Sequence, residues 1–407
     1  LFWEGSFAKY LELVRKDHRI VRNAHTRLYH MLRAMGIARD PEGKLQYKLF
    51  SKALFGIDGA LGKMTADYLF PASLGFDTRK RLLVLVGPVG SGKSTIVNLL
   101  KKGMEEYSHT KAGALYGIKG CPMHEEPLHL LPTDLRMKFF KGSRVMVEGD
   151  LCPVCQMMLK EVYQGKVEDV IVERVVISEK DRCGIGTISP SDPKSQDIAE
   201  LIGSLDFSTI GKYGSESDPR AYRFDGEICI ANRGILEFQE LFKFDERFLY
   251  NLLNLCQEGN FKIGRYALIS ADEEVVAHSN EEEFRRFLDN GSNEALLSRM
   301  MVIPVPYTLS VSQEIKVLDK LLTKGSYSRH LAPGTLDAIA SFMVLTRFSP
   351  DLKQGVGLLK RLEQYEAGGD AVSEVEPLER LPHGMSGIDP RFVFDTLAAA
   401  YTSPGSA

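Results

Sequence analysis

Residues 87–94 restrict the fold of this chain more than any other stretch. They read Gly-Pro-Val-Gly-Ser-Gly-Lys-Ser, which fits the pattern G-x-x-x-x-G-K-[ST] without mismatch. The apolar run Leu82–Val86 precedes them and suits a buried parallel strand, and a helical pattern begins near Ile96. Glycines let backbone N–H groups face phosphates at a helix N-terminus, where the helix dipole favours anions. We call residues 87–94 the phosphate loop; the alternative is a glycine-rich turn with a chance lysine.

The phosphate loop predicts a role for each of its polar residues. Lys93 is expected to reach the β- and γ-phosphates of a nucleotide, and Ser94 is expected to bind Mg²⁺. The sequence therefore predicts ATP and Mg²⁺ as cofactors. The residues expected to line the nucleotide here are Gly87, Pro88, Val89, Gly90, Ser91, Gly92, Lys93, Ser94 and Thr95.

Length and composition exclude several classes of protein. The 407 residues suggest two or three domains, and 44% apolar with 26% charged residues is ordinary for a soluble globular protein. A net charge of −3 predicts no nucleic-acid partner, although a local basic patch stays open. No run approaches the ~20 apolar residues of a membrane span, no signal peptide is expected, and six cysteines are too few for a disulfide scaffold. We expect a cytoplasmic protein that does not enter a membrane.

The patterns along the chain predict three regions. Residues 1–50 read as a helical N-terminal extension, and residues 51–310 read as an α/β core with a parallel sheet. An insertion at about 108–190 interrupts the core. Residues 311–407 are predicted to form a helical lid.

A nucleotide hydrolase with such a loop needs acidic residues after a second strand. Three segments compete for this role: Glu148 with Asp150, then Glu179, and then Glu240. We favour Glu240, because it directly follows the strand-like run Ile235–Gln239 and would activate the attacking water there. Gln239 occupies the position where a Mg²⁺-binding aspartate is expected. The alternative for Glu240 is a surface glutamate at the start of a helix.

A series of short motifs extends this pattern over nearly the whole chain. With the phosphate loop, the chain resembles the AAA+ ATPase module of the PrkA family, whose members are called serine protein kinases. The motifs that carry the resemblance include Trp3–Phe7, Leu54–Ile57, Gly184–Thr187, Lys194–Asp197, Ala231–Gly234, Ala277–Asn280, Asn293–Ala295, Arg299, Val305–Tyr307 and Gly387–Arg391.

The resemblance implies further site residues. Phe55, Gly56 and Ile57 would contact the nucleotide. Asn280 would be the sensor 1 side chain near the γ-phosphate, and Arg299 would be an arginine finger for the neighbouring subunit. Arg391 would be the sensor 2 arginine, with Arg347 as its rival. The alternatives are a helix-capping asparagine and ordinary surface arginines. With Gln239 in place of an aspartate, Mg²⁺ would rest on Ser94 and water, or on Glu237 in another register.

Two cysteine pairs in the insertion predict a metal site. Cys121-x-x-His124 and Cys152-x-x-Cys155 are separated by 27 residues, and together they offer a Cys₃His set for tetrahedral Zn²⁺. A closed set of four ligands indicates a structural zinc. His129 is a spare that could replace His124. The alternative is a set of scattered cysteines in a loop-rich insertion.

The predicted function is that of an ATP-binding and ATP-hydrolysing AAA+ module of a PrkA-type serine protein kinase. The family architecture implies a ring, a hexamer, because an arginine finger acts across subunits. An alternative is a ring-forming motor that remodels protein substrates, coupled to proteolysis, with Phe207 or Tyr213 gripping the threaded chain. A third hypothesis is a nucleotide-dependent scaffold. The chain holds no His-Arg-Asp catalytic loop and no Asp-Phe-Gly, so it does not itself show kinase chemistry.

Overall fold

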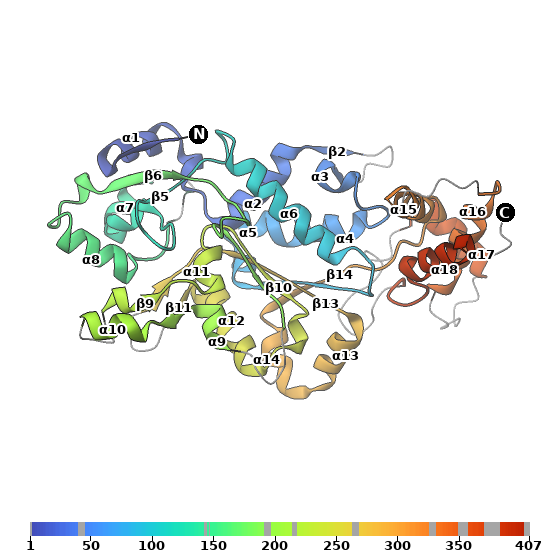
Figure 1. Ribbon diagram of the computed structural model, residues 1–407. Coiled ribbons are helices and arrows are strands. Elements are labelled where there is room, and N and C mark those ends of the chain that lie inside the picture. The colour runs from blue at the N-terminus through green and yellow to red at the C-terminus, as the bar shows by residue number, and fades with distance from the viewer. Residues whose placement is uncertain are drawn as a thin grey trace.

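The computed structural model describes a central parallel sheet of five strands (Figure 1). Its strands are β4 (Leu82–Val86), β7 (Ile185–Ile188), β10 (Ile235–Gln239), β13 (Glu274–Ser279) and β14 (Met300–Pro304). They lie in the order β14-β4-β13-β10-β7, and every neighbouring pair is parallel. The expected α/β fold with a parallel sheet is confirmed. The described residues are 2–39, 45–141, 145, 147–190, 197–213, 218–262, 268–324, 331–348, 357–369 and 383–402.

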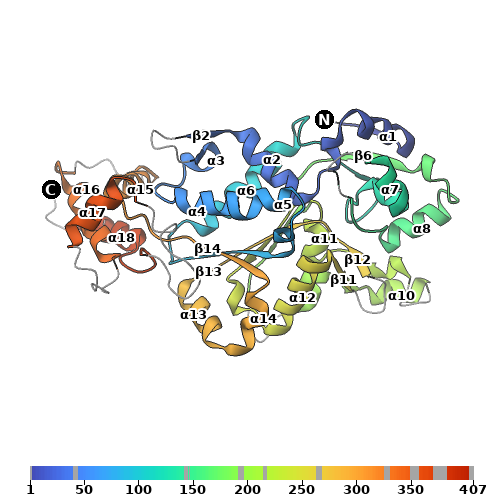
Figure 2. The ribbon, with the colours of Figure 1, turned by 180° about the vertical axis from the view of Figure 1, so that it is seen from behind.

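Helices cover both faces of this sheet (Figure 2). Leu83 and Leu85 of β4 pack on the side of α2 (Ala24–Met35) and α6 (Lys93–Ser108). Leu82 and Val84 point to the other side, where α12 (Glu246–Glu258) packs. Because neither side of β4 meets solvent, all five residues are apolar and buried. This is why the strand reads as a continuous apolar run rather than an alternating one.

A second, antiparallel sheet forms the core of the insertion. Its order is β1 (Glu4–Ser6), β6 (Ile171–Val175) and β5 (Leu115–Ile118). The helices around it are α1 (Phe7–Lys16), α7 (Thr133–Phe139) and α8 (Pro153–Glu161), which gather at one end of the molecule in both views (Figures 1 and 2).

Two expected boundaries differ from this arrangement. The N-terminal extension is not only helical, because β1 pairs with β6 of the insertion. Three residues are too few to show a strand pattern, and the pairing partner lies some 165 residues away. The insertion also ends before residue 190, since β7 pairs with β10 in the main sheet.

The C-terminal helices form a separate bundle at the end of the molecule opposite the insertion (Figures 1 and 2). They are α15 (Val311–Lys324), α16 (Thr335–Thr346), α17 (Leu358–Glu366) and α18 (Pro390–Thr402). Two small apolar clusters hold them, one around Val344 and Tyr365 and one around Leu318 and Met343. Across the described residues, no helix combines the length and the apolar character that crossing a membrane requires.

Shorter elements complete the described chain. The remaining strands are β2 (Ile37–Arg39), β3 (Leu45–Tyr47), β8 (Ser204–Leu205), β9 (Tyr222–Arg223), β11 (Asn260–Lys262) and β12 (Leu268–Ser270). The remaining α-helices are α3 (Lys48–Ser51), α4 (Asp58–Lys63), α5 (Phe70–Ser73), α9 (Ile198–Ile202), α10 (Phe207–Tyr213), α11 (Glu227–Ala231), α13 (Glu281–Asp289) and α14 (Glu294–Leu297). A π-helical stretch spans Met64–Leu69, and short 3₁₀ helices span His18–Val21, Asp77–Lys80, Pro127–Leu130, Val167–Asp169, Pro219–Ala221, Leu241–Lys243 and Gly291–Asn293.

Candidate functional site

The phosphate loop joins the end of β4 to the start of α6. Gly90 and Gly92 have φ angles of 81° and 100°, which a residue with a side chain adopts only under strain. The buried Lys93 donates from Nζ to the carbonyl oxygens of Gly87 at 2.6 Å and Pro88 at 2.7 Å. Burial lowers the pKa of Lys93 to about 8, while the charges of Glu240 and Asp389 raise it and that of Arg391 lowers it. Three groups from distant parts of the sequence thus act on this ammonium.

Glu240 follows the end of β10 in an unusual backbone conformation. Its φ of 53° lies in the left-handed region, which glutamate seldom adopts. Its carboxylate lies 3.4 Å from Nζ of Lys243. The amide oxygen of Gln239 accepts a hydrogen bond from Oγ of Ser189 at 2.8 Å. Strain of this kind often gathers at functional sites, which is consistent with the prediction for Glu240, although four other non-glycine residues among those described share a positive φ.

The rival acidic residues are engaged elsewhere. Glu237 is buried in an ion pair with Lys101 and lies 3.2 Å from Nε2 of His278. Glu179 also pairs with Lys101, at 2.8 Å. Glu148 pairs with Arg79, and Asp150 lies 3.4 Å from Arg136, both outside the main sheet. Of these residues only Glu240 stands at the end of a strand of the main sheet.

Asn280 lies directly after β13, the strand between β4 and β10. Ser279 accepts a hydrogen bond from the N–H of Gly87, so this strand end adjoins the phosphate loop. Oδ1 of Asn280 accepts from the N–H of Glu283 at 2.9 Å and caps α13. The residue is therefore a helix cap, as the alternative expectation held, and it stands beside the loop as the sensor expectation requires.

The stretch Phe55–Ile57 and the C-terminal helices approach the loop from its outer side. A Cβ built on Gly92 would lie 2.8 Å from Cδ2 of Leu54 and 4.0 Å from Cδ1 of Ile57. Gly56 has a φ of 68° and packs against Thr308. The ring of Phe55 lies 5.9 Å from Nζ of Lys320 in α15.

Arg347 and Arg391 occupy different environments. Arg347 is buried and forms an ion pair with Glu314 at 2.6 Å, and it also donates to the carbonyl oxygen of Thr308. Arg391 is exposed, and its charge acts on Lys93. Arg347 is thus held in the C-terminal bundle, whereas Arg391 is free of such burial, and its role stays a prediction.

Arg299 lies at the amino-terminal ends of the strands, whereas its own phosphate loop lies at their carboxyl-terminal ends. It precedes β14, and its carbonyl oxygen accepts from the N–H of Leu82, the first residue of β4. The loop follows the last residue of β4, so the length of a five-residue strand separates the two, roughly 17 Å. An arginine at this end of the strands would act on a nucleotide only if that nucleotide belonged to another subunit.

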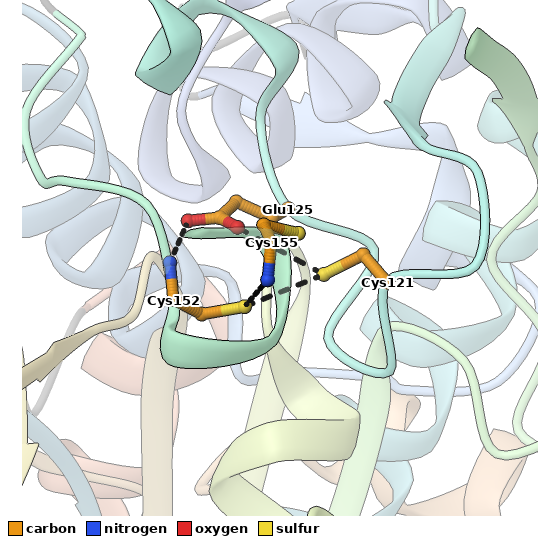
Figure 3. Close-up of side chains that lie close together, drawn as sticks. All are labelled: Cys121, Glu125, Cys152 and Cys155. Carbon is orange, nitrogen blue, oxygen red and sulfur yellow. Dashed lines mark hydrogen bonds between the residues drawn. The ribbon is translucent and has the colours of Figure 1, made fainter. Parts of the chain in front are cut away.

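Three cysteines and a glutamate meet in the insertion (Figure 3). One ligand atom from each of Cys121, Glu125, Cys152 and Cys155 lies within 4.8 Å of all the others, and all four residues are buried. The Sγ atoms of Cys121 and Cys152 are 3.9 Å apart, and Oε2 of Glu125 is 3.9 Å from Sγ of Cys121. Three sulfurs and a carboxylate oxygen are donors that Zn²⁺ accepts in a tetrahedral site. We call these four residues the cysteine cluster.

The expected fourth ligand, His124, is not part of the cysteine cluster. Its backbone has a φ of 47°, and this left-handed turn brings the following side chain, Glu125, to the sulfurs instead. The spacing C-x-x-H suggested histidine because histidine is the commoner zinc ligand. Only the turn, which local spacing does not reveal, distinguishes the two neighbours.

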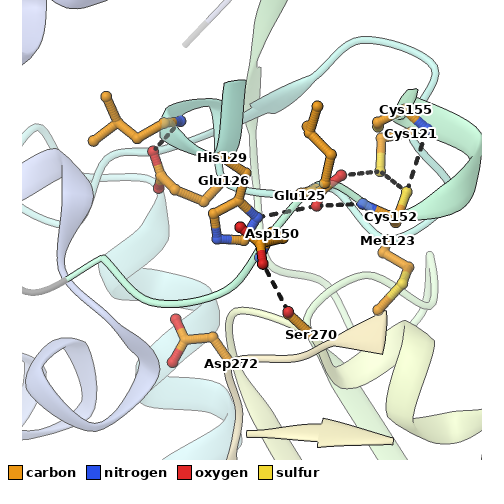
Figure 4. A network of polar contacts seen from close by, with 12 residues as sticks. Cys121, Met123, Glu125, Glu126, His129, Asp150, Cys152, Cys155, Ser270 and Asp272 are labelled. Atoms are coloured by element: carbon orange, nitrogen blue, oxygen red, sulfur yellow. Dashed lines mark hydrogen bonds and ion pairs between the residues drawn. The ribbon is translucent and has the colours of Figure 1, made fainter. Parts of the chain in front are cut away.

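A chain of polar contacts connects the cysteine cluster to the hairpin of β11 and β12 (Figure 4). Oε1 of Glu125 accepts from the N–H of Cys152 at 2.8 Å and lies 3.0 Å from Nδ1 of His129. Nε2 of His129 lies 2.7 Å from the carbonyl oxygen of Glu148. Two residues later the N–H of Asp150 donates to Oγ of Ser270 in β12. Burial, with a smaller contribution from Cys152, raises the pKa of Glu125 to about 7.

A polar cavity of about 400 Å³ lies next to this chain of contacts. Its charged walls pair with each other, Arg79 with Glu148 at 2.7 Å and Arg233 with Glu126 at 2.6 Å. No residue of the phosphate loop lines it. The cavity is thus separate from the nucleotide site.

Comparisons with known proteins show the family of this chain. The family model described as the PrkA AAA domain matches residues 5–354. The chain is 50% identical over 407 residues to the "ATP-dependent protease PrkA" of Bacillus subtilis. It is 28% identical over 424 residues to the "Serine/threonine kinase YeaG" of Escherichia coli K12. Each alignment covers 98% of this chain and 64% of the relative, so the chain spans just under two thirds of these relatives' length.

Solved structures that match are more distant in sequence. A magnesium chelatase BchI–BchD complex matches with 17% identity and a TM-score of 0.39, over 73% of each chain. NtrX from Brucella abortus in complex with ADP matches with 10% identity and a TM-score of 0.34, over 75% of this chain and 48% of that one.

Proposed function

Because this chain belongs to the PrkA AAA domain family, within the AAA+ ATPases, we propose that it binds ATP with Mg²⁺ and hydrolyses it at the phosphate loop. The observation that carries the proposal is the convergence on Lys93. Glu240 and Arg391 act on its ammonium from two other segments, and Asn280 begins the helix that follows the neighbouring strand. Such convergence is what phosphoryl transfer to water requires.

In this proposal each residue has one task. Lys93 exchanges its bonds to the loop carbonyls for bonds to the β- and γ-phosphates. Glu240 orients the attacking water and accepts its proton. Asn280 offers its amide N–H groups to the γ-phosphate, while Arg391 and a neighbouring subunit's Arg299 stabilise the developing negative charge.

Mg²⁺ would be held by the exposed Ser94 hydroxyl, and when bound it neutralises phosphate charge. The carboxylate of Glu237 is already held by Lys101 and His278. Ser94 with water is thus the better supported of the two expected binding modes.

The direct test is phosphate release by Lys93→Ala. We expect turnover to fall to background, while Lys102→Ala, an exposed lysine on the same helix, keeps the wild-type rate. Glu240→Gln should still bind ATP and lose hydrolysis by two or more orders of magnitude. Unchanged turnover in Lys93→Ala would refute the proposal.

What the hydrolysis drives concerns the longer protein. We infer a ring, a hexamer, that remodels protein substrates and feeds proteolysis, because the 50% identical relative bears the name of an ATP-dependent protease. The 28% identical relative bears the name of a kinase, which supports serine phosphorylation as the second candidate. Incubation with γ-labelled ATP and a serine-rich protein separates the two. Labelled free phosphate without labelled protein favours the motor. Lys93-dependent label on protein serine favours the kinase.

The division of the chain into domains and the cellular location of the protein are part of the same proposal. We infer a lid from residue 311 onward, because α15, α16, α17 and α18 have apolar clusters of their own. Limited proteolysis that released this bundle intact would support the division. The cytoplasmic location stays a prediction, and fractionation of cells tests it.

We also infer that the cysteine cluster holds a structural Zn²⁺. Its support is the buried group of three sulfurs and one carboxylate, which is closed by four ligands and leaves no position for a substrate. Zinc content of purified protein should be near one per chain and should fall in Cys152→Ser and Glu125→Ala. His124→Ala and Cys183→Ser are the matched controls. If zinc were lost from His124→Ala but kept in Glu125→Ala, His124 and not Glu125 would be the fourth ligand.

A further inference from the structure

The carboxylate of Asp389 lies against the phosphate loop. A Cβ built on Gly90 would come within 2.5 Å of Oδ1 and 3.2 Å of Cγ of Asp389. Gly90 stands at the turn of the loop, where backbone N–H groups are expected to receive phosphates. An acidic side chain is an unexpected neighbour there, because its charge has the sign of the phosphates themselves.

Local bonds fix this carboxylate in place. Asp389 precedes α18, and its Oδ1 accepts from the N–H of Arg391 at 2.9 Å. The N–H of Phe392 donates to the carbonyl oxygen of Asp389 at 3.1 Å. Asp389 is thus the cap of α18, and the helix start determines where its charge points.

The turn before Asp389 is anchored to the buried Arg347. Nη2 of Arg347 donates to the carbonyl oxygen of Ile388 at 3.3 Å and to Oε1 of Glu314 at 2.8 Å. A Cβ built on Gly387 would lie 3.1 Å from Cα of Arg347. The position of Asp389 is therefore determined by the core of the C-terminal bundle.

Tyr307 joins the bundle to the same loop. Its hydroxyl donates to the carbonyl oxygen of Val89, its ring lies 4.7 Å below the guanidinium of Arg347, and its N–H donates to Gly384. The bundle and the loop thus meet through Tyr307 and Asp389 together, and movement of one requires movement of the other.

We propose that Asp389 is an electrostatic gate of the nucleotide site. Its carboxylate opposes the entry of phosphates, so that ATP binding must displace the 387–391 turn and with it the C-terminal bundle. The same displacement would reposition Arg391, two residues further on. The inference rests on the proposed nucleotide function and adds a residue that weakens binding of the polyphosphate instead of contributing to it.

The state of Lys93 agrees with this gate. Its ammonium bonds the carbonyl oxygens of Gly87 and Pro88. The negative charge of Asp389 acts on the same ammonium. The positive charge of the loop is thus already partly balanced from within the chain.

The test is nucleotide affinity in Asp389→Asn. Asparagine keeps the capping oxygen and removes the charge, and Asp389→Ser is a second variant that also caps a helix. The matched control is Asp395→Asn, an exposed aspartate on the same helix. Dissociation constants for ATP, ADP and adenosine are measured by displacement of a fluorescent nucleotide at 50 and 300 mM salt.

We expect Asp389→Asn to bind ATP at least tenfold tighter than wild type, ADP less so and adenosine unchanged. The gain should shrink at high salt because charges are screened there. An unchanged or weaker ATP affinity in both Asp389 variants would overturn the proposal. An equal gain for adenosine would also overturn it, since the turn would then act by steric blocking.

Lys93→Ala separates this inference from the function on which it rests. If ATP binding depends on Lys93 and does not respond to Asp389→Asn, only the gate fails. If wild type and Asp389→Asn both bind ATP no better than Lys93→Ala, the nucleotide function fails and the gate fails with it.

Discussion

Burial changes the pKa values of single residues in and beside the main sheet. Glu274 at the start of β13 is fully buried and lies 3.1 Å from Nε2 of His25. Burial raises the pKa of Glu274 to about 8 and lowers the pKa of His25 to about 4. Both side chains are therefore neutral near pH 7, and the pair is a close contact between neutral groups and not an ion pair.

The raised pKa of Glu274 predicts that stability falls as pH rises toward 8. Because the folded state holds this proton more tightly than the unfolded state, stability falls as pH rises from about 4.5 to about 8. The lowered pKa of His25 has the opposite effect, because it makes stability rise with pH between about 4 and 6.5. Between pH 6.5 and 8 the pH dependence of this pair therefore comes from Glu274.

We expect Glu274→Gln to gain about 1–2 kcal/mol over wild type between pH 6.5 and pH 8. Urea unfolding at the two pH values measures it, with the exposed Glu258→Gln as control. A pH-independent difference between Glu274→Gln and wild type would contradict the buried titration.

Among single residues, the sequence predicted the roles that depend on neighbours along the chain. The phosphate loop was visible because its residues are consecutive and its chemistry depends on their order. Glu125 was missed because the choice between it and His124 depends on one left-handed turn. The gate at Asp389 was also invisible, since its partner Gly90 lies some 300 residues away.

Between elements, a buried charge network attaches α6 to the sheet. Lys101 is 2% exposed, pairs with Glu237 of β10 and donates to Oγ1 of Thr187 in β7 at 2.6 Å. Removing one partner of a buried pair leaves the other charge without compensation. The helix that follows the phosphate loop is thus fixed to two strands by charge as well as by apolar packing.

We expect Lys101→Met to lower the free energy of unfolding by about 3–5 kcal/mol, and Lys101→Met with Glu237→Leu to recover most of that loss. Lys102→Met, its exposed neighbour, should change stability by less than about 0.5 kcal/mol. Denaturant unfolding of the four proteins measures these differences. A double variant less stable than Lys101→Met would contradict this expectation, because the uncompensated charge of Glu237 would then not be the cause of the loss.

Elements were predictable where their pattern is long and uniform. The strand Leu82–Val86 was expected within its observed bounds, since burial on both sides makes it wholly apolar. The run Ile235–Gln239 was likewise expected as a strand. By contrast, β1 has three residues, and only its pairing with β6 makes it a strand.

At the scale of the whole molecule, the phosphate loop and Arg299 lie at opposite ends of two neighbouring strands, β4 and β14. Within a ring, such a separation lets each subunit offer its loop to one neighbour and its arginine to the other. The complete site would then be shared between two copies of the chain.

Mixing two inactive variants tests this sharing. We expect Lys93→Ala and Arg299→Ala each to lose at least tenfold in ATP turnover. Their equimolar mixture should regain activity, because some interfaces then combine an intact loop with an intact arginine. Arg285→Ala, an exposed arginine nearby on α13, should retain wild-type turnover alone. A mixture no more active than the average of its components would place Arg299 outside the shared site.

The position of β4 in the sheet has a consequence for biosynthesis. Both of its neighbours, β13 and β14, lie about 190 to 220 residues later in the sequence. At a synthesis rate of about 5–20 residues per second, β4 leaves the ribosome roughly 10 to 40 seconds before its partners exist. During that interval an entirely apolar strand has unpaired edges. Until its last core strand emerges, a nascent chain of this topology therefore exposes an apolar strand that favours aggregation.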